Sequence, residues 1–125
     1  AAVIPKFIKR ILSDKSPVIY GNGEQTRDFT YVEDVVSANI SAAEKKEIGV
    51  FNIAGGKRIT INNLAEKIID IIGKKVNIIY SKARPGDILH SLADISKAKK
   101  IIKYEPKFNL KKGLEKTIKW YQKQI

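Results

Sequence analysis

Helix-spaced apolar segments alternate with short β-prone runs along this 125-residue chain, and this alternation limits the folds open to it. It is typical of a mixed α/β arrangement, in which helices pack on a small sheet. The helices expected from the spacing are 3–12, 32–44, 61–72, 96–103 and 110–124. The expected strands are 18–20, 29–32, 50–54 and 76–80. Because no linker-like stretch interrupts them, we expect one small mixed α/β domain over residues 1–125.

Turn and capping signals set the boundaries of several of these elements. Pro5 suits the first turn of the opening helix, where a missing N–H costs nothing. The Gly-Asn-Gly sequence at 21–23 separates two β-prone runs and predicts a hairpin turn. It is not a dinucleotide-binding fingerprint, because Thr26 replaces the third glycine and a strand follows. Thr60 is expected to cap the helix behind it, and Gly73 to end that helix.

The composition carries a strong excess of positive charge. The chain has 20 Lys and 4 Arg against 13 acidic residues, which gives a net charge of +11. Such an excess occurs in nucleic-acid-binding proteins, but many lysines here follow helix-surface spacing, as at 97, 99, 100 and 103. They are not interleaved with aromatic residues, as on a surface that binds single strands. The pattern therefore favours a solvated basic surface over a nucleic-acid site, and it suits a small phosphate-bearing ligand.

Several residue types are missing, and their absence excludes some kinds of site in this chain. It contains no cysteine, so disulfides, thiolate metal ligands and cysteine nucleophiles are excluded. His90 is the only histidine, and we assign no catalytic role to it. No apolar run approaches the ~20 residues that span a bilayer, and no signal-peptide pattern opens the sequence. We expect a cytoplasmic protein, and the lack of methionine leads us to expect that residue 1 is not the native start.

Two of the four arginines stand in loop positions of a chain that otherwise uses lysine for positive charge. Arg27 lies between a turn and a strand, and Arg84 begins the sequence Arg-Pro-Gly-Asp. A guanidinium group offers a planar fork of donors that matches phosphate oxygens, which an ammonium group does not. The same residues could instead form structural ion pairs, Arg27 with Asp28 or Glu33 and Arg84 with Asp87. Spacing alone leaves both interpretations open.

The carboxylates near these arginines differ in what they predict. The Pro-Gly pair at 85–86 predicts a tight turn that would aim Arg84 and Asp87 in related directions. A cation beside a carboxylate suits a ligand that carries both phosphate and hydroxyl groups, since an aspartate commonly holds ribose hydroxyls. Glu33 and Asp34 stand at the start of a predicted helix, where they are expected to interact favourably with the helix dipole.

Three stretches carry a resemblance to a known family. They are IYGNGEQTRDFTYVEDVV, VFNIAGGKRITINNLAEKI and RPGDILHSLADISKAKKIIKYEPKFNLKKGLEKTIKWY, in that order. With the opening VIPKFIKRIL they resemble the extended short-chain dehydrogenases/reductases, and more narrowly the NAD-dependent epimerase/dehydratase enzymes of the UDP-glucose 4-epimerase type. The likeness covers essentially the whole chain. It implies a small α/β substrate-binding domain without the Rossmann domain.

The resemblance also implies the roles of five residues. Arg27 and Arg84 would grip the diphosphate of a UDP- or dTDP-sugar from two sides. Asp87 would hold the ribose hydroxyls, and Val18 and Tyr20 would line the base pocket. The chain would thus bind the nucleotide-sugar substrate.

The family's NAD fingerprint and its Tyr-x-x-x-Lys pair are not found here. None of the five tyrosines is followed by lysine four residues later. The resemblance therefore implies that NAD and the catalytic residues belong to an amino-terminal domain outside this chain, and that this chain alone is inactive. It implies that 51–54 and the helix from Val32 pack against that domain, and that the parent enzyme is a homodimer.

Two departures from the family pattern bear on these expectations. Lys103 stands where a glycine commonly precedes Tyr-x-Pro, which would place a lysine in a left-handed conformation. Ser91 stands where some galactose epimerases carry an aromatic residue. The sugar therefore stays open, as does the choice between epimerase, dehydratase and decarboxylase. The alternative function is a non-catalytic module that binds nucleotide-sugars or polyanions such as nucleic acids.

Overall fold

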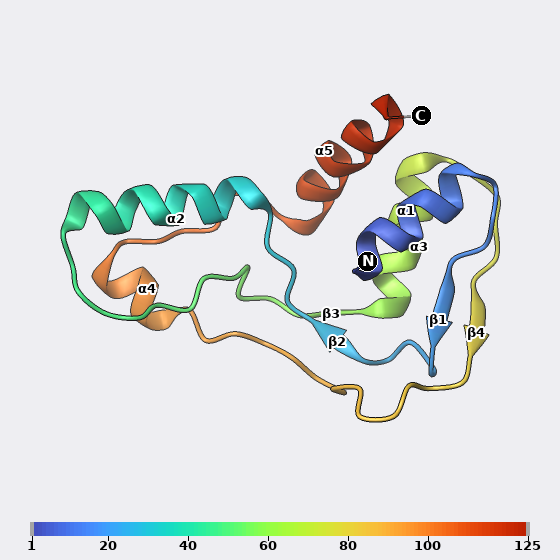
Figure 1. Cartoon of the computed structure of the whole chain (residues 1–125), viewed down its shortest axis with the longest axis horizontal. Coiled ribbons are helices and arrows are strands. Elements are labelled where there is room, and N and C mark those ends of the chain that lie inside the picture. Colours follow the sequence, from blue (N-terminus) through green and yellow to red (C-terminus); the bar gives the residue numbers. More distant parts are fainter. Residues whose placement is uncertain (1, 125) are drawn as a thin grey trace.

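The computed structural model describes residues 2–124 and shows helices joined by short strands and long loops (Figure 1). The helices are α1 (Val3–Leu12), α2 (Val32–Lys45), α3 (Ile61–Ile72), α4 (Ser96–Ile101) and α5 (Leu110–Lys123). The strands are β1 (Val18–Tyr20), β2 (Thr26–Arg27), β3 (Ile59–Thr60) and β4 (Ile79–Ser81). Every helix predicted from apolar spacing is confirmed, with α4 two residues shorter than expected. The predicted small mixed α/β fold is confirmed too.

The predicted caps of α3 are both present. The Thr60 hydroxyl accepts a hydrogen bond from the Asn63 backbone N–H at 3.1 Å. Gly73 ends the helix in the left-handed conformation, with φ of 79°. These caps satisfy backbone groups that the helix itself leaves unpaired, and they fix where α3 begins and ends. The start of α3 matters for function because it lies against the loop that follows β1.

Helices α1, α3 and α5 pack together and form the larger apolar core (Figure 1). Their buried side chains recur at helical spacing, as Ile8 and Ile11 do on α1 and Leu64 and Ile68 do on α3. Each such side chain contributes about 1.5–3 kcal/mol by its burial. Ile19 of β1 joins the same core, which anchors the strand against the helices. One wall of the candidate site is therefore built on the best-packed part of the molecule.

A second, smaller core lies between α2, α4 and the segment 51–54. Ala38, Ala98 and Ile102 are buried in it, and the buried Tyr104 hydroxyl donates to the Ala54 carbonyl at 2.7 Å. Lys103 has φ of 57°, so it takes the left-handed conformation that the family's glycine implied.

The strand pairings differ from those expected. Strand β1 pairs in parallel with β4, and β2 pairs antiparallel with β3. The predicted hairpin at 21–23 is wrong, because the loop packs on α3 instead of joining two paired strands. The Asn62 backbone N–H donates to the Gly23 carbonyl at 3.0 Å, and a Cβ on Gly23 would lie 2.0 Å from the Asn62 side chain. Glycine at this position is thus required by close approach and by its φ of 78°.

Two predicted strands are not formed, and two short strands, β2 and β3, were not expected. Segment 29–31 is an extended connection into α2, and 50–54 is irregular. The latter has β-prone residues but no neighbouring strand to pair with in the part of the chain that the structure describes. Strands β2 and β3 were missed because two residues each give no periodic signal, and Arg27 lies within β2 and not between a turn and a strand. The predicted strand at 76–80 is confirmed in part, as β4 at 79–81.

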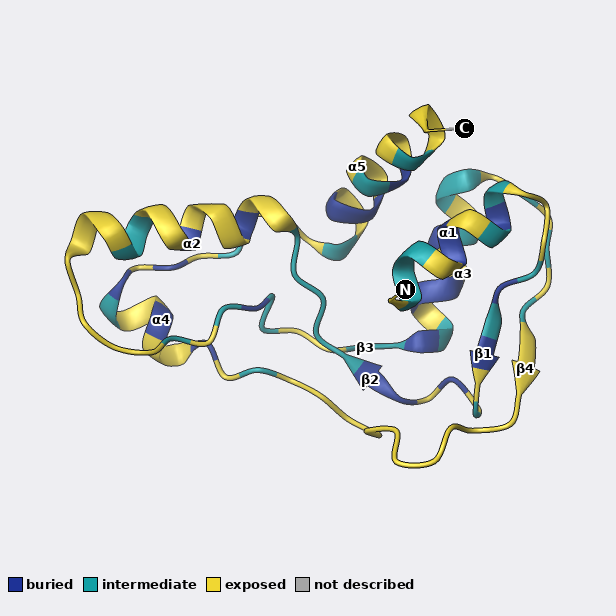
Figure 2. Cartoon of the chain, in the orientation of Figure 1, coloured by how far each residue is buried: buried dark blue, intermediate teal, exposed yellow. Residues whose placement is uncertain are grey.

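Helix α2 buries little of its own surface, as Figure 2 shows. Of its expected packing face, Ala38 is buried, whereas Val36 is 50% exposed; Ile40 on the same helix is 54% exposed. Asp34 lies in the first turn of α2, as expected for an interaction with the helix dipole, and it also makes a tertiary contact that the sequence did not predict. Its carboxylate is 2% exposed and accepts hydrogen bonds from the backbone N–H groups of Lys107 and Phe108. Asp34 therefore ties α2 to the loop before α5.

Candidate functional site

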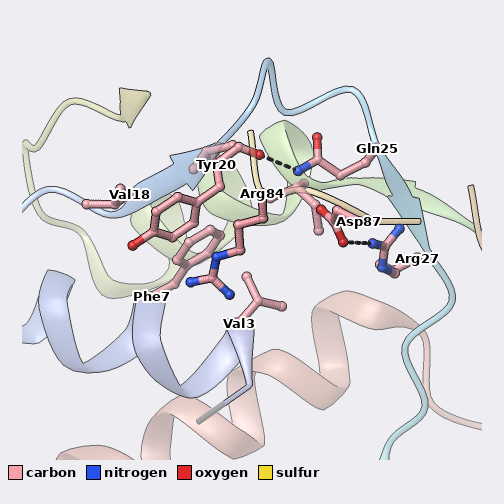
Figure 3. Close-up of a pocket in the computed structure, with 10 residues that line it drawn as sticks. Val3, Phe7, Val18, Tyr20, Gln25, Arg27, Arg84 and Asp87 are labelled. Carbon is pink, nitrogen blue, oxygen red and sulfur yellow. Dashed lines mark hydrogen bonds and ion pairs between the residues drawn. The ribbon is translucent and has the colours of Figure 1, made fainter. Parts of the chain in front are cut away.

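A pocket of about 220 Å³ lies between α1, the loop after β1 and the loop after β4 (Figure 3). All five residues predicted to bind substrate line it, although 69 positions separate Val18 from Asp87 in sequence. The complete lining is Val3, Phe7, Val18, Ile19, Tyr20, Gln25, Arg27, Ile61, Arg84 and Asp87. The fold thus gathers apolar side chains, two guanidinium groups and one carboxylate around one hollow.

Both ends of the loop that carries Arg84 and Asp87 are tied down by backbone hydrogen bonds. At one end, parallel pairing places Ser81 opposite Tyr20, and the Gly21 N–H donates to the Ser81 carbonyl at 2.9 Å. At the other end, Thr26 donates to the Leu89 carbonyl at 2.8 Å and accepts from the Ser91 N–H at 3.1 Å. The loop is therefore held beside β1 and β2, the strands that carry Tyr20 and Arg27.

Arg27 and Asp87 form an ion pair across this pocket. The Nη2 atom of Arg27 lies 3.0 Å from Oδ1 of Asp87, and Nη1 donates to the Thr26 carbonyl at 2.7 Å. The alternative pairing of Arg27 with Asp28 is not formed. Asp28 instead accepts from the backbone N–H groups of Gly55 and Gly56. The pocket therefore holds a cation and a carboxylate whose charges neutralise each other.

The spacing allowed an ion pair between Arg84 and Asp87, but this pair is not formed among the described residues. The turn between them is formed as predicted, with the Asp87 N–H donating to the Arg84 carbonyl at 3.3 Å and Gly86 at φ of 76°. The Arg84 guanidinium carbon instead lies 4.1 Å from the centre of the Tyr20 ring. The turn therefore separates the two side chains, and Asp87 reaches Arg27.

A second hollow of about 570 Å³ adjoins the first and shares Val3, Phe7, Val18, Tyr20 and Arg84 with it. Lysine and arginine side chains of α1 complete its lining, at positions 6, 9 and 10. Apolar and aromatic side chains thus form the part next to Val18 and Tyr20, and cations surround it. An arrangement of this kind can accept a flat, partly apolar group whose neighbour carries negative charge.

Sequence reasoning missed several residues of the pocket. Gln25 is only 9% exposed, and its side-chain amide donates to the Tyr20 carbonyl at 3.0 Å, which closes the loop after β1. Phe7 and Ile61 were assigned to the core, and they also form the apolar wall. A structural role for Gln25 could have been suspected from the sequence, because this polar residue directly precedes Thr26 and Arg27 in the Gln-Thr-Arg-Asp-Phe stretch. His90 lies at the edge of the region, with Nδ1 2.9 Å from the Thr26 hydroxyl oxygen.

Other kinds of site find no support in the described residues. Between residues 2 and 124, no group of three histidine, cysteine, aspartate or glutamate side chains is placed to hold a metal ion. Over the same stretch, none of the helices combines the length and apolar character needed to cross a bilayer.

Comparisons with known proteins place these features in context. The sequence matches the family described as GDP-mannose 4,6 dehydratase over residues 1–117. A UDP-glucuronate 4-epimerase from Thermodesulfobacterium geofontis is 37% identical over 121 residues, which are 96% of this chain and 38% of that protein. The chain therefore spans about two fifths of the length of such relatives.

Comparison with solved structures also finds sugar-nucleotide epimerases as similar proteins. A UDP-N-acetylglucosamine 4-epimerase from Methanobrevibacter ruminantium, in complex with UDP-N-acetylmuramic acid, superposes with a TM-score of 0.94 at 49% identity, over 100% of this chain and 40% of that one. A UDP-glucuronic acid 4-epimerase from Bacillus cereus, in complex with UDP-glucuronic acid and NAD, gives 0.92 at 35% identity, over 99% and 40%.

Proposed function

This chain belongs to the GDP-mannose 4,6-dehydratase family, within the extended short-chain dehydrogenases/reductases, and from that premise we propose that it is the substrate-binding part of a UDP- or dTDP-sugar epimerase or dehydratase. The UDP-glucose 4-epimerase type is the parent we favour. One observation carries the proposal: Val18, Tyr20, Arg27, Arg84 and Asp87, which the family pattern singles out, line one pocket. Residues this far apart in sequence meet there because the loop after β4 is tied to both β1 and β2.

Each part of the pocket suits one part of a nucleoside diphosphate. The guanidinium groups of Arg27 and Arg84 can each offer two donors to phosphate oxygens. The Asp87 carboxylate can accept hydrogen bonds from the two ribose hydroxyls. Val18 and Tyr20 border the larger hollow, whose apolar part suits the base. The sugar would then extend toward the part of the enzyme that carries the catalytic residues.

NAD would be bound by a domain other than this chain, because the residues here do not fit it. The one glycine pair with the expected spacing, Gly21 and Gly23, lies in a loop packed on the start of α3 and does not open a helix of its own. A dinucleotide needs such a helix start for its pyrophosphate. In the proposed parent, bound NAD supplies reversible oxidation of a sugar carbon. The role of this chain is to bind and orient the nucleotide.

We further propose that α2 and the segment 51–54 face that NAD-binding domain. Val36 and Ile40 are exposed on α2, and Val50 is 84% exposed beyond it. Exposed apolar side chains favour association where they lie together on one surface. The 125-residue chain alone should therefore self-associate in light scattering, and co-expression with the proposed amino-terminal domain should make it monodisperse. A monodisperse, cooperatively melting monomer of the chain alone would contradict this domain arrangement.

The ligand assignment is tested by calorimetry on the complete polypeptide, meaning this chain with its proposed NAD-binding domain. Charge-assisted hydrogen bonds contribute about 1.5–3 kcal/mol each. Arg27→Ala or Arg84→Ala should therefore weaken UDP binding roughly 10- to 150-fold and leave NAD binding unchanged. Arginine-to-lysine variants should recover only part of the loss, because a point charge lacks the bidentate geometry.

Arg58→Ala is the matched control, since it removes an exposed arginine outside the pocket. It should bind UDP like the unaltered protein. The assignment is wrong if Arg27→Ala and Arg84→Ala also bind UDP normally, or if they lose NAD affinity by the same factor.

A further inference from the structure

The Arg84 guanidinium has an aromatic partner in place of an acidic one. It lies over the Tyr20 ring at 4.1 Å from the ring centre, the shortest such distance among the described residues. The cations over Tyr121, Phe51 and Phe108 lie at 5.0–6.0 Å. Within residues 2–124 no carboxylate lies within ion-pairing distance of Arg84, since Asp87 pairs with Arg27. The Arg84 guanidinium therefore contacts an aromatic ring and, within the described residues, pairs with no carboxylate.

The backbone of Tyr20 is held in place on both sides. Its strand pairs with β4, and its carbonyl accepts a hydrogen bond from the buried Gln25 side chain. A Cβ on Gly21 would lie 3.6 Å from the Ala83 Cβ, so the segments that carry Tyr20 and Arg84 run in close contact. Figure 3 shows the Arg84 guanidinium beside the Tyr20 ring.

We infer that Tyr20 is a positioning residue that acts through Arg84, and that its ring face holds the guanidinium in place for the diphosphate before the ligand arrives. This inference rests on the proposed function of Arg84 as a phosphate ligand. A long, exposed side chain loses rotamer freedom when it binds a phosphate, and prior stacking on an aromatic ring reduces that loss. The stacked arrangement also keeps the charge unpaired, so that no ion pair has to be broken.

The inference differs from a role of Tyr20 in contacting the base directly. If the ring acts through Arg84, its removal matters only while Arg84 is present. If the ring grips the base, its removal weakens binding by the same factor with or without Arg84. A double-mutant cycle separates the two cases.

The cycle uses Tyr20→Leu, Arg84→Ala and the double variant in the complete polypeptide, with UDP titrated into each. We expect Tyr20→Leu to weaken UDP binding about 2- to 30-fold, the range that a cation–π contact supports. We expect Tyr20→Phe to bind like the unaltered protein, because the ring face is kept. The double variant should bind like Arg84→Ala alone.

A spectroscopic measurement keeps the test valid should Tyr20→Leu fold poorly. A proton held over an aromatic ring shows an upfield NMR shift. The Arg84 side-chain signals should show this shift in the unaltered protein and in Tyr20→Phe, and should lose it in Tyr20→Leu. Missing upfield shifts in the unaltered protein, or an equal effect of Tyr20→Leu in the Arg84→Ala background, would overturn the inference. Normal UDP binding by Arg84→Ala alone would instead overturn the proposed function.

Discussion

Arg27 and Asp87 are 60 residues apart in the chain, yet their charged groups meet at 3.0 Å in the pocket. They are the two groups proposed to bind different parts of one ligand, the diphosphate and the ribose. The ion pair is partly exposed, with side-chain exposures of 25% and 42%, so water and salt weaken it. A bound nucleotide would replace this ion pair with two contacts, one between its diphosphate and Arg27 and one between its ribose and Asp87.

This pairing predicts opposite effects of Asp87→Asn on two ligands. Freeing Arg27 should tighten inorganic pyrophosphate binding about 1.4- to 5-fold, which is the worth of an exposed ion pair. UDP should bind less tightly, because the ribose loses a charged acceptor. Calorimetry with both ligands on the complete polypeptide measures the two changes.

The control for this prediction is Asp14→Asn. Asp14 pairs with Lys74 at 2.8 Å outside the pocket, so its replacement changes the net charge equally. It should leave both affinities nearly unchanged. If Asp87→Asn shifts UDP and pyrophosphate binding in the same direction, the two groups do not divide the ligand as proposed.

The isolated chain should not interconvert UDP-glucose and UDP-galactose when NAD is added. None of its tyrosines precedes lysine at the catalytic spacing, and no loop within residues 2–124 fits the dinucleotide. A coupled assay with purified residues 1–125 measures the turnover. The control is a mock preparation from cells that do not express the chain. Epimerisation above this background would contradict the proposal that NAD and the catalytic residues belong to another domain.

Asp34→Ala should destabilise the fold strongly. The change leaves the backbone N–H groups of Lys107 and Phe108 without their acceptor, at about 1–3 kcal/mol for each group. Glu33→Ala is the matched control, since the neighbouring Glu33 carboxylate is exposed and its contact with Lys116 measures 3.8 Å. Urea unfolding should give a large loss for the first variant and less than about 1 kcal/mol for the second. Equal losses would show that the Asp34 carboxylate does not tie α2 to the loop before α5.

Tyr104 should make stability fall at high pH. Burial, together with the nearby carboxylates of Asp34 and Asp28, raises the pKa of its hydroxyl from 10.0 to about 12. Between these two pKa values the unfolded chain has lost the proton and the folded chain still holds it. The contribution of Tyr104 is therefore complete below pH 10 and is lost as the pH rises toward 12.

Urea unfolding of the unaltered chain and of Tyr104→Phe, compared over this pH range, isolates the contribution of Tyr104. The difference in unfolding free energy between the two should shrink as the pH rises. A difference that does not change with pH would contradict the raised pKa.

The helices could be predicted from sequence because their signals are local. Ile61, Leu64 and Ile68 repeat at helical spacing, and Thr60 and Gly73 mark the two ends of that helix. The strands could not be predicted as well, because a strand needs a partner that local sequence does not specify. Segment 50–54 has the right residues and stays irregular, and β3 forms from two residues because β2 lies beside it.

The site, like the fold, has parts that the sequence predicted and parts that it could not. The family pattern singled out Arg27, Arg84 and Asp87, and the unusual use of arginine pointed to two of them independently. The ion pair between Arg27 and Asp87 could not be predicted, because it depends on backbone bonds between Thr26 and the loop at 89–91. The contact between Arg84 and Tyr20 likewise follows from the parallel pairing of β1 with β4.

The most direct test of the central claim is a crystal structure of the complete polypeptide with UDP bound. Phosphate oxygens should lie at hydrogen-bond distance, about 2.7–3.2 Å, from the guanidinium groups of both Arg27 and Arg84. The ribose hydroxyls should lie at Asp87, and the contact between Arg27 and Asp87 should be broken or shared. UDP bound elsewhere, with the Arg27–Asp87 pair intact and Arg84 free of phosphate, would contradict the claim that this chain holds the nucleotide of the substrate.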